Sequence, residues 1–122
     1  MPPESSIAIV DDDESVREAI RNLLRSAGYH ADVYASAEEF LASAQIASTS
    51  CLILDVRMPG MTGLELQTHL LSSHRPIAAV FITAHADDKA KARALHAGAV
   101  AFLRKPFSDR ALLDAIALAV GA

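Results

Sequence analysis

The sequence predicts an α/β domain with a doubly wound, five-stranded parallel sheet and helices on both faces. Short apolar runs of strand length alternate with segments whose apolar residues recur at helical spacing, and this pair of patterns appears five times. Such alternation forms parallel sheets whose right-handed crossovers place helices on both faces. The 122 residues contain no obvious repeat or low-complexity tract, so residues 1–122 are expected to form one domain.

The first two strands and their helices have clear boundaries. Ile7–Val10 is an apolar run that predicts the first strand, and His30–Ala35 alternates as an edge strand does. Between them, apolar residues at helical spacing lead to a glycine that favours a helix end: Val16, Ala19, Ile20, Leu23, Leu24, Ala27 and Gly28. Ser36 and Glu39 have capping-box spacing and open a second helix. This helix is expected to bury Ala37, Phe40, Leu41 and Ala44.

A loop separates the third strand from the third helix. Cys51–Leu54 is a continuous apolar run, which is typical of a central strand covered on both faces. Residues 58–61, Met-Pro-Gly-Met, predict a loop because proline and glycine break regular structure. Thr62 and Glu65 form a second capping box, which opens a helix that reaches about Ser73.

The fourth strand precedes an alanine-rich helix. Ile77–Thr83 predicts the strand, and Asp87 and Asp88 favour the start of a helix that reaches about Ala97. Leu95 is the only large apolar residue of this helix, so its packing is expected to be the loosest in the domain.

The last strand and helix complete the sheet. Ala99–Leu103 predicts the strand, and Ser108 caps the helix. Its apolar stripe consists of Leu112, Ala115, Ile116, Ala119 and Val120. With the flavodoxin-like strand order 2-1-3-4-5, the order reverses between the strands that end near Asp11 and Asp55. Ligands of such sheets bind beyond the carboxyl ends of the strands at this point of reversal.

Polar residues stand at the ends of four of these strands, namely Asp11 and Asp12, Asp55, Thr83 and Lys105. Two unit charges about 4 Å apart repel by roughly 4 kcal/mol at an effective dielectric constant near 20, so three neighbouring carboxylates need a cation. Mg²⁺ prefers carboxylate oxygens and bridges protein to phosphate. A metal, a lysine and a hydroxyl are groups that stabilise a phosphoryl group in transfer. Asp55, at the end of the central strand, is the expected nucleophile.

Most of these residues have an ordinary structural explanation when each is taken alone. Residues 11–14 resemble an acidic helix start, Thr83 a strand residue, Phe102 a core residue and Lys105 a surface charge. Asp55 is the exception, because an aspartate that ends an apolar strand needs partners. The joint pattern favours a site.

Composition excludes several classes of function. The net charge is −4 and the 11 basic residues are scattered, so no nucleic-acid surface is expected. The one cysteine, Cys51, lies in an apolar run, which excludes an internal disulfide and suits a reducing compartment. No signal peptide or apolar run of roughly 20 residues is present, so a cytoplasmic protein without membrane contact is expected.

Four segments resemble the motifs of the response-regulator receiver domains of two-component signalling: Ile9–Asp13, Leu54–Gly60, Ile82–Ala84 and Lys105–Phe107. The resemblance spans essentially the whole chain, and residues 57–59 and 83–85 are most similar to the FixJ-like branch. It implies that residues 1–122 are a receiver domain whose Asp55 accepts a phosphoryl group from a sensor histidine kinase.

The resemblance also implies roles for the surrounding residues. Asp12, Asp55 and the backbone carbonyl of Arg57 would bind Mg²⁺, with Mn²⁺ able to replace it, and Asp11 would act through a bound water. Lys105 would pair with the Asp55 carboxylate and then with the phosphoryl oxygens, and the peptide before Pro106 would be cis.

The output implied by the resemblance involves a second set of residues. Phosphorylation would draw in the Thr83 hydroxyl and turn Phe102 inward, which changes the face formed by the fourth helix, fifth strand and fifth helix. This face would control an output domain beyond Ala122 or a partner, in a transcription regulator, and would support a homodimer. Ala84 would leave the site open to the imidazole of the donor, while Arg57 and His85 would tune the lifetime of the aspartyl phosphate.

The expected protein is thus a switch that assists only its own phosphorylation and dephosphorylation, and not an enzyme that turns over a free substrate. A Mg²⁺-dependent aspartyl phosphatase of the haloacid-dehalogenase type needs Asp-x-Asp, but the residue two positions after Asp55 is Arg57. A nucleotide-binding enzyme is not expected either, because the chain contains neither a glycine-rich dinucleotide loop nor a P-loop. A pseudo-receiver that binds partners without phosphorylation stays open at this point.

Overall fold

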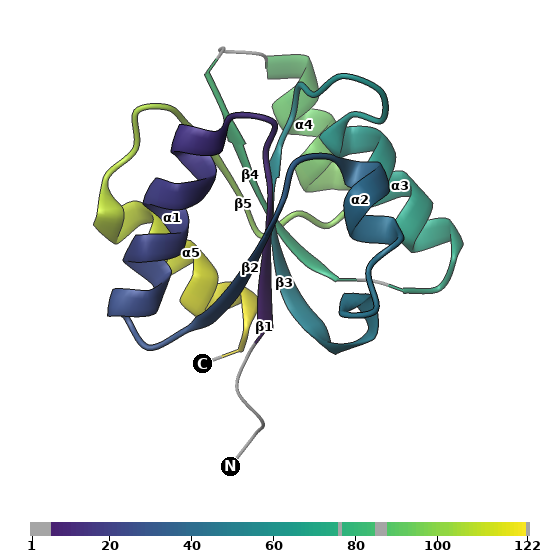
Figure 1. Ribbon diagram of the computed structural model, residues 1–122. Coiled ribbons are helices and arrows are strands. Elements are labelled where there is room, and N and C mark those ends of the chain that lie inside the picture. The colour runs from purple at the N-terminus through teal and green to yellow at the C-terminus, as the bar shows by residue number, and fades with distance from the viewer. Residues whose placement is uncertain (1–5, 76, 85–87, 122) are drawn as a thin grey trace.

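Five parallel strands form one sheet between two helical layers in the computed structural model, which describes residues 6–75, 77–84 and 88–121 (Figure 1). The order β2-β1-β3-β4-β5 confirms the flavodoxin-like prediction. The strands are β1 (Ser6–Val10), β2 (His30–Tyr34), β3 (Thr49–Asp55), β4 (Ala78–Thr83) and β5 (Ala101–Arg104). The helices are α1 (Glu14–Ser26), α2 (Ala37–Leu41), the 3-10 helix η1 (Ile46–Ser48), α3 (Gly63–Ser72), α4 (Asp88–His96) and α5 (Asp109–Ala119).

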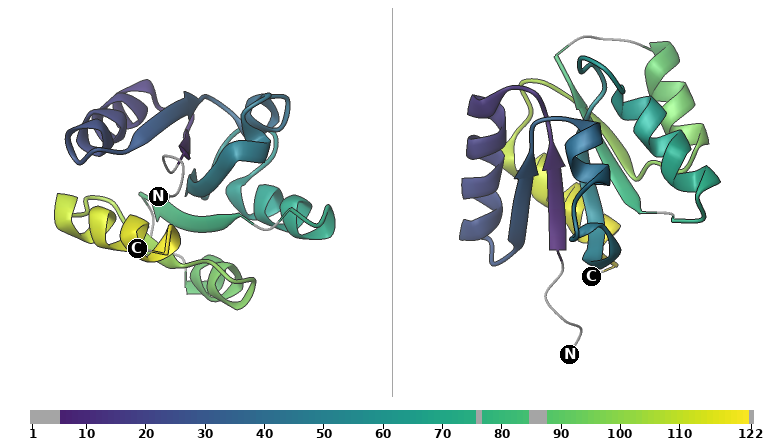
Figure 2. Two further views of the ribbon diagram at one scale, coloured as in Figure 1. Left: turned by 90° about the horizontal axis from the view of Figure 1, so that it is seen from below. Right: turned by 45° about the vertical axis from the view of Figure 1, so that its right-hand side comes forward.

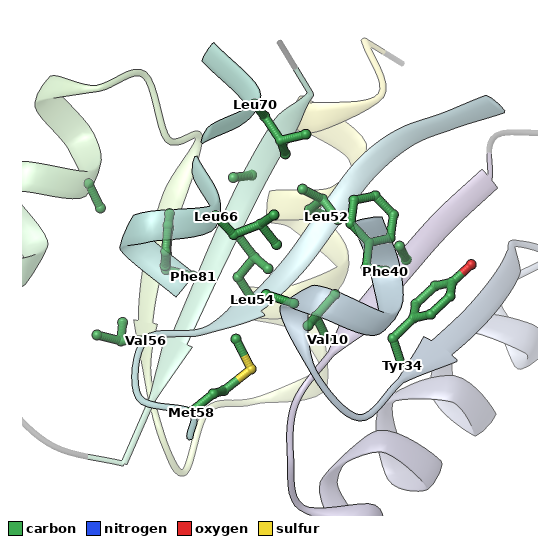
Figure 3. Close-up of a cluster of buried hydrophobic side chains, with 14 of the residues drawn as sticks. Val10, Tyr34, Phe40, Leu52, Leu54, Val56, Met58, Leu66, Leu70 and Phe81 are labelled. Atoms are coloured by element: carbon green, nitrogen blue, oxygen red, sulfur yellow. The ribbon is translucent and has the colours of Figure 1, made fainter. Parts of the chain in front are cut away.

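The sheet separates two apolar cores. Helices α1 and α5 cover one face, and α2, α3 and α4 cover the other (Figures 1 and 2). Leu52 and Leu54 of β3 point into the core below α2 and α3 (Figure 3), whereas Ile53 belongs to the core on the opposite face. Successive strand residues point to opposite faces, so a strand covered on both sides is apolar at every position. This explains the continuous apolar run of β3.

Side-chain caps fix the starts of four helices. Asp13, Ser36, Thr62 and Ser108 each accept hydrogen bonds from backbone N–H groups in the first turn of their helix. At Thr62 the predicted capping box is complete, since the Glu65 carboxylate also accepts from the Thr62 N–H at 2.9 Å. At Ser36 it is not, because the Glu39 carboxylate accepts from the N–H of Ala35 instead, at 3.2 Å.

Several boundaries differ from the predictions, most by one residue, and β3 begins at Thr49, two residues before the predicted Cys51. Helix α2 ends at Leu41, and Ala44, which was expected to be buried, is exposed. Strand β5 begins at Ala101 and not at Ala99, because the chain needs two residues after Gly98, whose φ is 104°, to pass from α4 to the sheet. Asp87, expected at the start of α4, lies outside the described residues.

Candidate functional site

The sheet brings the predicted residues to one edge. Strands β1 and β3 end side by side, with Val10 paired to Leu54, so Asp11 follows β1 next to the point where Asp55 ends β3. Asp55 is also paired with Ile82 of β4, and Thr83 ends that strand. Lys105 follows β5 directly. The parallel register alone therefore gathers residues that are up to 94 positions apart.

Three carboxylates form the centre of this edge. One oxygen each of Asp11, Asp12 and Asp55 lies within 4.8 Å of the other two. Asp11 is fully buried and Asp55 is 9% exposed, whereas Asp12 is exposed. The cluster is thus closed on the protein side and open to solvent at Asp12, where a ligand can enter.

Lys105 supplies the positive charge. Its Nζ lies 3.2 Å from Oδ2 of Asp11 and 3.8 Å from Oδ2 of Asp55. The predicted partner was Asp55, yet the shorter contact is to Asp11. Because Asp11 has no exposed surface, its charge depends on a protein partner more than that of Asp55 does.

The surroundings of Asp55 make its carboxyl group harder to ionise than that of an ordinary aspartate when no metal is bound. Burial raises the pKa of the Asp55 carboxyl most, and the charges of Asp11 and Asp12 raise it further. The Arg57 N–H, which donates to Asp55 Oδ1 at 3.2 Å, and Lys105 lower this pKa only in part. The site therefore holds more negative charge than its own residues offset.

A divalent cation fits this excess of negative charge. Three carboxylates in reach of one another are the oxygen ligands that Mg²⁺ prefers, and the chain turns sharply after Asp55 so that the Arg57 backbone borders the same cluster. The donor set here is therefore compatible with that ion.

The remaining predicted residues differ in their burial. Thr83 is 2% exposed, while Ala84 and the Arg57 side chain are exposed. The Lys105–Pro106 peptide is cis, as predicted. Phe102 is half-buried and stacks on Phe81, with ring centroids 6.1 Å apart. His85 lies outside the described residues.

Three residues that support the site or the loop beside it were missed by sequence reasoning. Gly63 packs so closely on the backbone carbonyl of Asp55 that a Cβ atom has no room. Arg17 donates to the backbone carbonyl of Asp11 at 2.8 Å, and Glu38 accepts from the N–H of Met61 at 2.9 Å. Only Gly63 had a signal in the sequence, since a glycine in the first turn of a helix is unfavourable without a reason.

Cys51 has no part in the site. It is fully buried in β3, and burial raises the pKa of its thiol to about 12, so it acts as a small apolar side chain.

Comparison with known proteins agrees with this geometry. The family model for the response regulator receiver domain matches residues 7–117. The chain is a response-regulator receiver domain. Nodulation protein W of Bradyrhizobium diazoefficiens is 48% identical to this receiver over 115 residues, which cover 93% of this chain and 50% of that protein.

Solved receivers share the fold. The response regulator StyR is 48% identical, with a TM-score of 0.90 over 98% of this chain and 60% of that one. FixJ-N is 35% identical, with a TM-score of 0.88 over 98% of this chain and 96% of that one, which agrees with the FixJ-like branch. This receiver spans about half the length of the curated relatives it matches. Within the described residues, no helix combines the length and apolar character needed to cross a bilayer.

Proposed function

We propose that residues 1–122 are one receiver domain that serves as the phosphorylatable switch of a two-component phosphorelay. Asp55 accepts the phosphoryl group from a sensor histidine kinase. One observation carries this proposal: at the end of the central strand, Asp55 forms a carboxylate cluster with buried Asp11 and exposed Asp12, and Nζ of Lys105 is 3.8 Å from the Asp55 carboxylate.

The transfer exchanges one bond to phosphorus for another. A carboxylate oxygen of Asp55 attacks phosphorus, and a phosphorus–oxygen bond forms as the phosphorus–nitrogen bond of the phosphohistidine breaks. The electron pair of the broken bond stays on the imidazole, which takes up a proton. Exposed Ala84 has no side chain long enough to block the approach of this ring. Lys105, which reaches Asp55 as well as Asp11, neutralises charge on the phosphoryl oxygens.

Asp12, Asp55 and the backbone carbonyl of Arg57 would hold Mg²⁺ or Mn²⁺, and Asp11 would act through a bound water. The ion would offset the charge of the carboxylates and of the phosphoryl oxygens. The exposure of Asp12 and the raised pKa of Asp55 both support a site that is completed by a cation.

The output runs through the face formed by α4, β5 and α5. The new charge on Asp55 draws in the Thr83 hydroxyl, and Phe102 turns further inward, which biases this face between two states. Thr83 ends the strand next to Asp55, and Phe102 is half-buried, so both are placed for these movements. The face then controls an output domain or partner in a cytoplasmic transcription regulator. The half-length match to regulators such as the transcriptional regulatory protein FixJ supports an output domain.

This receiver assists its own phosphorylation and dephosphorylation and turns over no free substrate. It binds neither nucleic acid nor membrane, which agrees with its net charge of −4. A pseudo-receiver is the second candidate. It is disfavoured because Asp55 and Lys105, which such a module does not need, lie together in the pocket.

The test is incubation with acetyl phosphate and Mg²⁺ followed by intact mass spectrometry. The wild-type chain should gain one phosphoryl group, and EDTA or Asp55→Asn should abolish the gain. Glu18→Gln, an exposed change on α1, should leave it intact. An unmodified wild-type chain that also fails to bind beryllium fluoride would establish the pseudo-receiver instead.

Arg57, Ala84 and His85 should set the lifetime of the aspartyl phosphate by controlling water access. Arg57→Ala and His85→Ala should each change the decay rate severalfold once free phosphodonor is removed. Decay rates equal to the wild-type rate in both variants would remove this role.

A further inference from the structure

Helix α2 contributes no residue to the acidic cluster, yet it holds the loop that leaves Asp55. Glu38 in the first turn of α2 accepts a hydrogen bond from the backbone N–H of Met61 at 2.9 Å. The two residues are 23 positions apart, and the loop between β3 and α3 contains Met61. Glu38 is exposed, so its carboxylate is not needed to fill the core.

The loop is shaped to receive this carboxylate. Gly60 has a φ of 75°, a conformation that side-chain-bearing residues rarely adopt, and a Cβ built on it would lie 2.6 Å from Oε2 of Glu38. The glycine thus lets the backbone approach the carboxylate closely enough for Met61 to donate. The Met61 N–H, followed by the N–H of Glu38 itself, holds the pKa of the Glu38 carboxyl below its ordinary value, as expected for a bound carboxylate.

Hydrogen bonds also hold the start and the end of the loop between β3 and α3. Near its start, the Arg57 N–H donates to the Asp55 carboxylate at 3.2 Å, and at its end Gly63 donates to the Val56 carbonyl at 3.2 Å. Met58 is buried in the apolar cluster that also contains Phe40 of α2 (Figure 3). Between these points two carboxylates accept from backbone N–H groups: Glu65 of α3 accepts from Thr62, and Glu38, which belongs to neither the loop nor α3, accepts from Met61 next to the exposed Pro59 and Gly60.

We propose that Glu38 is a positioning residue for the phosphoacceptor site, which fixes the loop of residues 57–61 and thereby the Arg57 backbone carbonyl that completes the cation site. This inference rests on the proposed function. Glu38 touches neither substrate nor cation, and it acts through the Met61 N–H. A loop held in its final shape loses less freedom when the cation binds, so the anchor increases affinity by preorganisation.

The charge of Glu38 offers a competing explanation, since any carboxylate near the pocket attracts a cation. Two substitutions separate charge from hydrogen bonding. Glu38→Gln removes the charge but keeps an oxygen that accepts from Met61, whereas Glu38→Ala removes both. Glu39→Gln, on the adjacent exposed residue, removes the same charge without touching the loop, because Glu39 accepts from Ala35.

The experiment is calorimetric titration of the four chains with Mg²⁺ alone, together with amide hydrogen exchange of Met61 in EDTA. Loss of the anchor should weaken Mg²⁺ binding by about three- to tenfold in Glu38→Ala, the range expected for one hydrogen bond. Glu38→Gln should lie between this variant and the wild type, because neutral acceptors form weaker hydrogen bonds. Glu39→Gln should match the wild type. The Met61 amide should exchange faster in Glu38→Ala than in the other chains.

Each other result has a distinct meaning. Equal weakening in all three variants would show that charge alone acts and would overturn the inference. Unchanged Mg²⁺ affinity in Glu38→Ala with a faster Met61 amide would show that the loop is anchored without consequence for the site, and would also overturn it. In both cases wild-type binding of Mg²⁺ would leave the proposed function intact. A wild-type chain that binds no Mg²⁺ would overturn both.

Discussion

Single residues at the sheet edge show how burial and charge oppose each other. Asp11 and Asp55 are removed from water with one lysine between them, and burial, followed by the Asp11 charge, raises the pKa of Asp55 above its usual 3.8. The folded state therefore holds the Asp55 proton more tightly than the unfolded chain does. The resulting stabilisation is complete below pH 3.8 and is lost as the pH rises through the raised pKa.

Asp55→Asn should therefore stabilise the metal-free protein at neutral pH. Removal of one of three clustered charges should raise the free energy of unfolding by about 1–3 kcal/mol at pH 7 in EDTA. The difference should shrink as the pH falls through the raised pKa of Asp55 and vanish below pH 3.8, where the carboxyl is protonated in both the folded and the unfolded chain. Urea unfolding across this pH range measures it. Mg²⁺ at ten times its dissociation constant should raise the free energy of unfolding of the wild type by about 1.4 kcal/mol. It should raise that of Asp55→Asn by less, so the two chains should become closer in stability. If Asp55→Asn were less stable than the wild type in EDTA at pH 7, the carboxylates of the cluster would not repel one another on balance.

Gly63→Ala should damage the fold and the site together. The added Cβ has no room beside the Asp55 carbonyl, so the start of α3 must move away from β3. We expect a loss of about 2–3 kcal/mol in the free energy of unfolding, together with weaker Mg²⁺ binding. Gly98→Ala is the control. Its φ of 104° strains any side chain, but nothing lies within 4 Å of the new Cβ, so stability should fall while Mg²⁺ affinity does not. Equal Mg²⁺ affinity in Gly63→Ala and the wild type would contradict the coupling.

The sequence predicted the acidic cluster but not its supports. Asp11, Asp55 and Lys105 each stand at a strand end, so the parallel topology alone brings them together. The contact of Glu38 with Met61 depends on the angle of a five-residue helix and on the left-handed Gly60. No local pattern encodes such an angle, so this kind of support appears only in three dimensions.

The elements were predicted best where local chemistry decides their ends. Thr62 starts α3 as expected, because the capping box is made within four residues. Helix α2 stops early for a tertiary reason. The Ser43 hydroxyl bonds to the Tyr34 hydroxyl of β2 at 3.0 Å and accepts from the Gln45 N–H at 3.0 Å, which draws the chain out of the helix.

Among the α-helices, α4 has the smallest apolar anchors. It buries only Ala90 and Ala94 among its described residues, and Leu95 is 41% exposed, as the prediction of loose packing implied. A polar contact supplements these alanines. The buried Gln67 of α3 donates from Nε2 to the Ala94 carbonyl at 3.1 Å, and the same carbonyl accepts from the Ala99 N–H at 3.0 Å. The end of α4 is thus held by α3, the helix that begins beside Asp55.

Gln67→Leu should therefore loosen α4 selectively. The variant keeps most of the buried volume but loses the donor, and we expect about 1–2 kcal/mol less stability. Amide hydrogen exchange should accelerate most in the last turn of α4 and at Ala99. Thr68→Ala is the control, since Thr68 is exposed and bonds only within α3 among the described residues. A uniform acceleration over the whole domain would show a general loss of stability and no specific tie.

At the scale of the whole molecule, β5 contributes residues to both cores, with Phe102 packed against one and Ala101 and Leu103 against the other. This edge strand is only half-buried, with α4 beside it on one face of the sheet and α5 on the other (Figure 2). The acidic cluster lies at the carboxyl end of the same sheet. Phe102 lies in β5, which belongs to the proposed output face, and Lys105 directly follows this strand. A change at Asp55 thus has a short structural route to α4, β5 and α5.

Leu95 on α4 gives this face an exposed apolar residue, which is expected to contribute to a contact between two copies of the chain. Beryllium fluoride with Mg²⁺, which mimics the phosphorylated state, should shift the wild type from monomer towards dimer in sedimentation velocity. Asp55→Asn should show no shift, because it lacks the acceptor. Leu95→Glu should bind beryllium fluoride normally but stay monomeric, since a buried unpaired charge at a contact is strongly unfavourable.

Leu71→Glu is the matched control for this experiment. Leu71 is 44% exposed, close to the value for Leu95, but it lies on α3 outside the proposed face, so its variant should dimerise like the wild type. Loss of dimerisation in both leucine variants would mean that acidic charge in general opposes association. Loss in Leu71→Glu alone would move the contact to α3. Only loss in Leu95→Glu alone agrees with an output face built from α4, β5 and α5, because the two variants differ in position and not in chemistry.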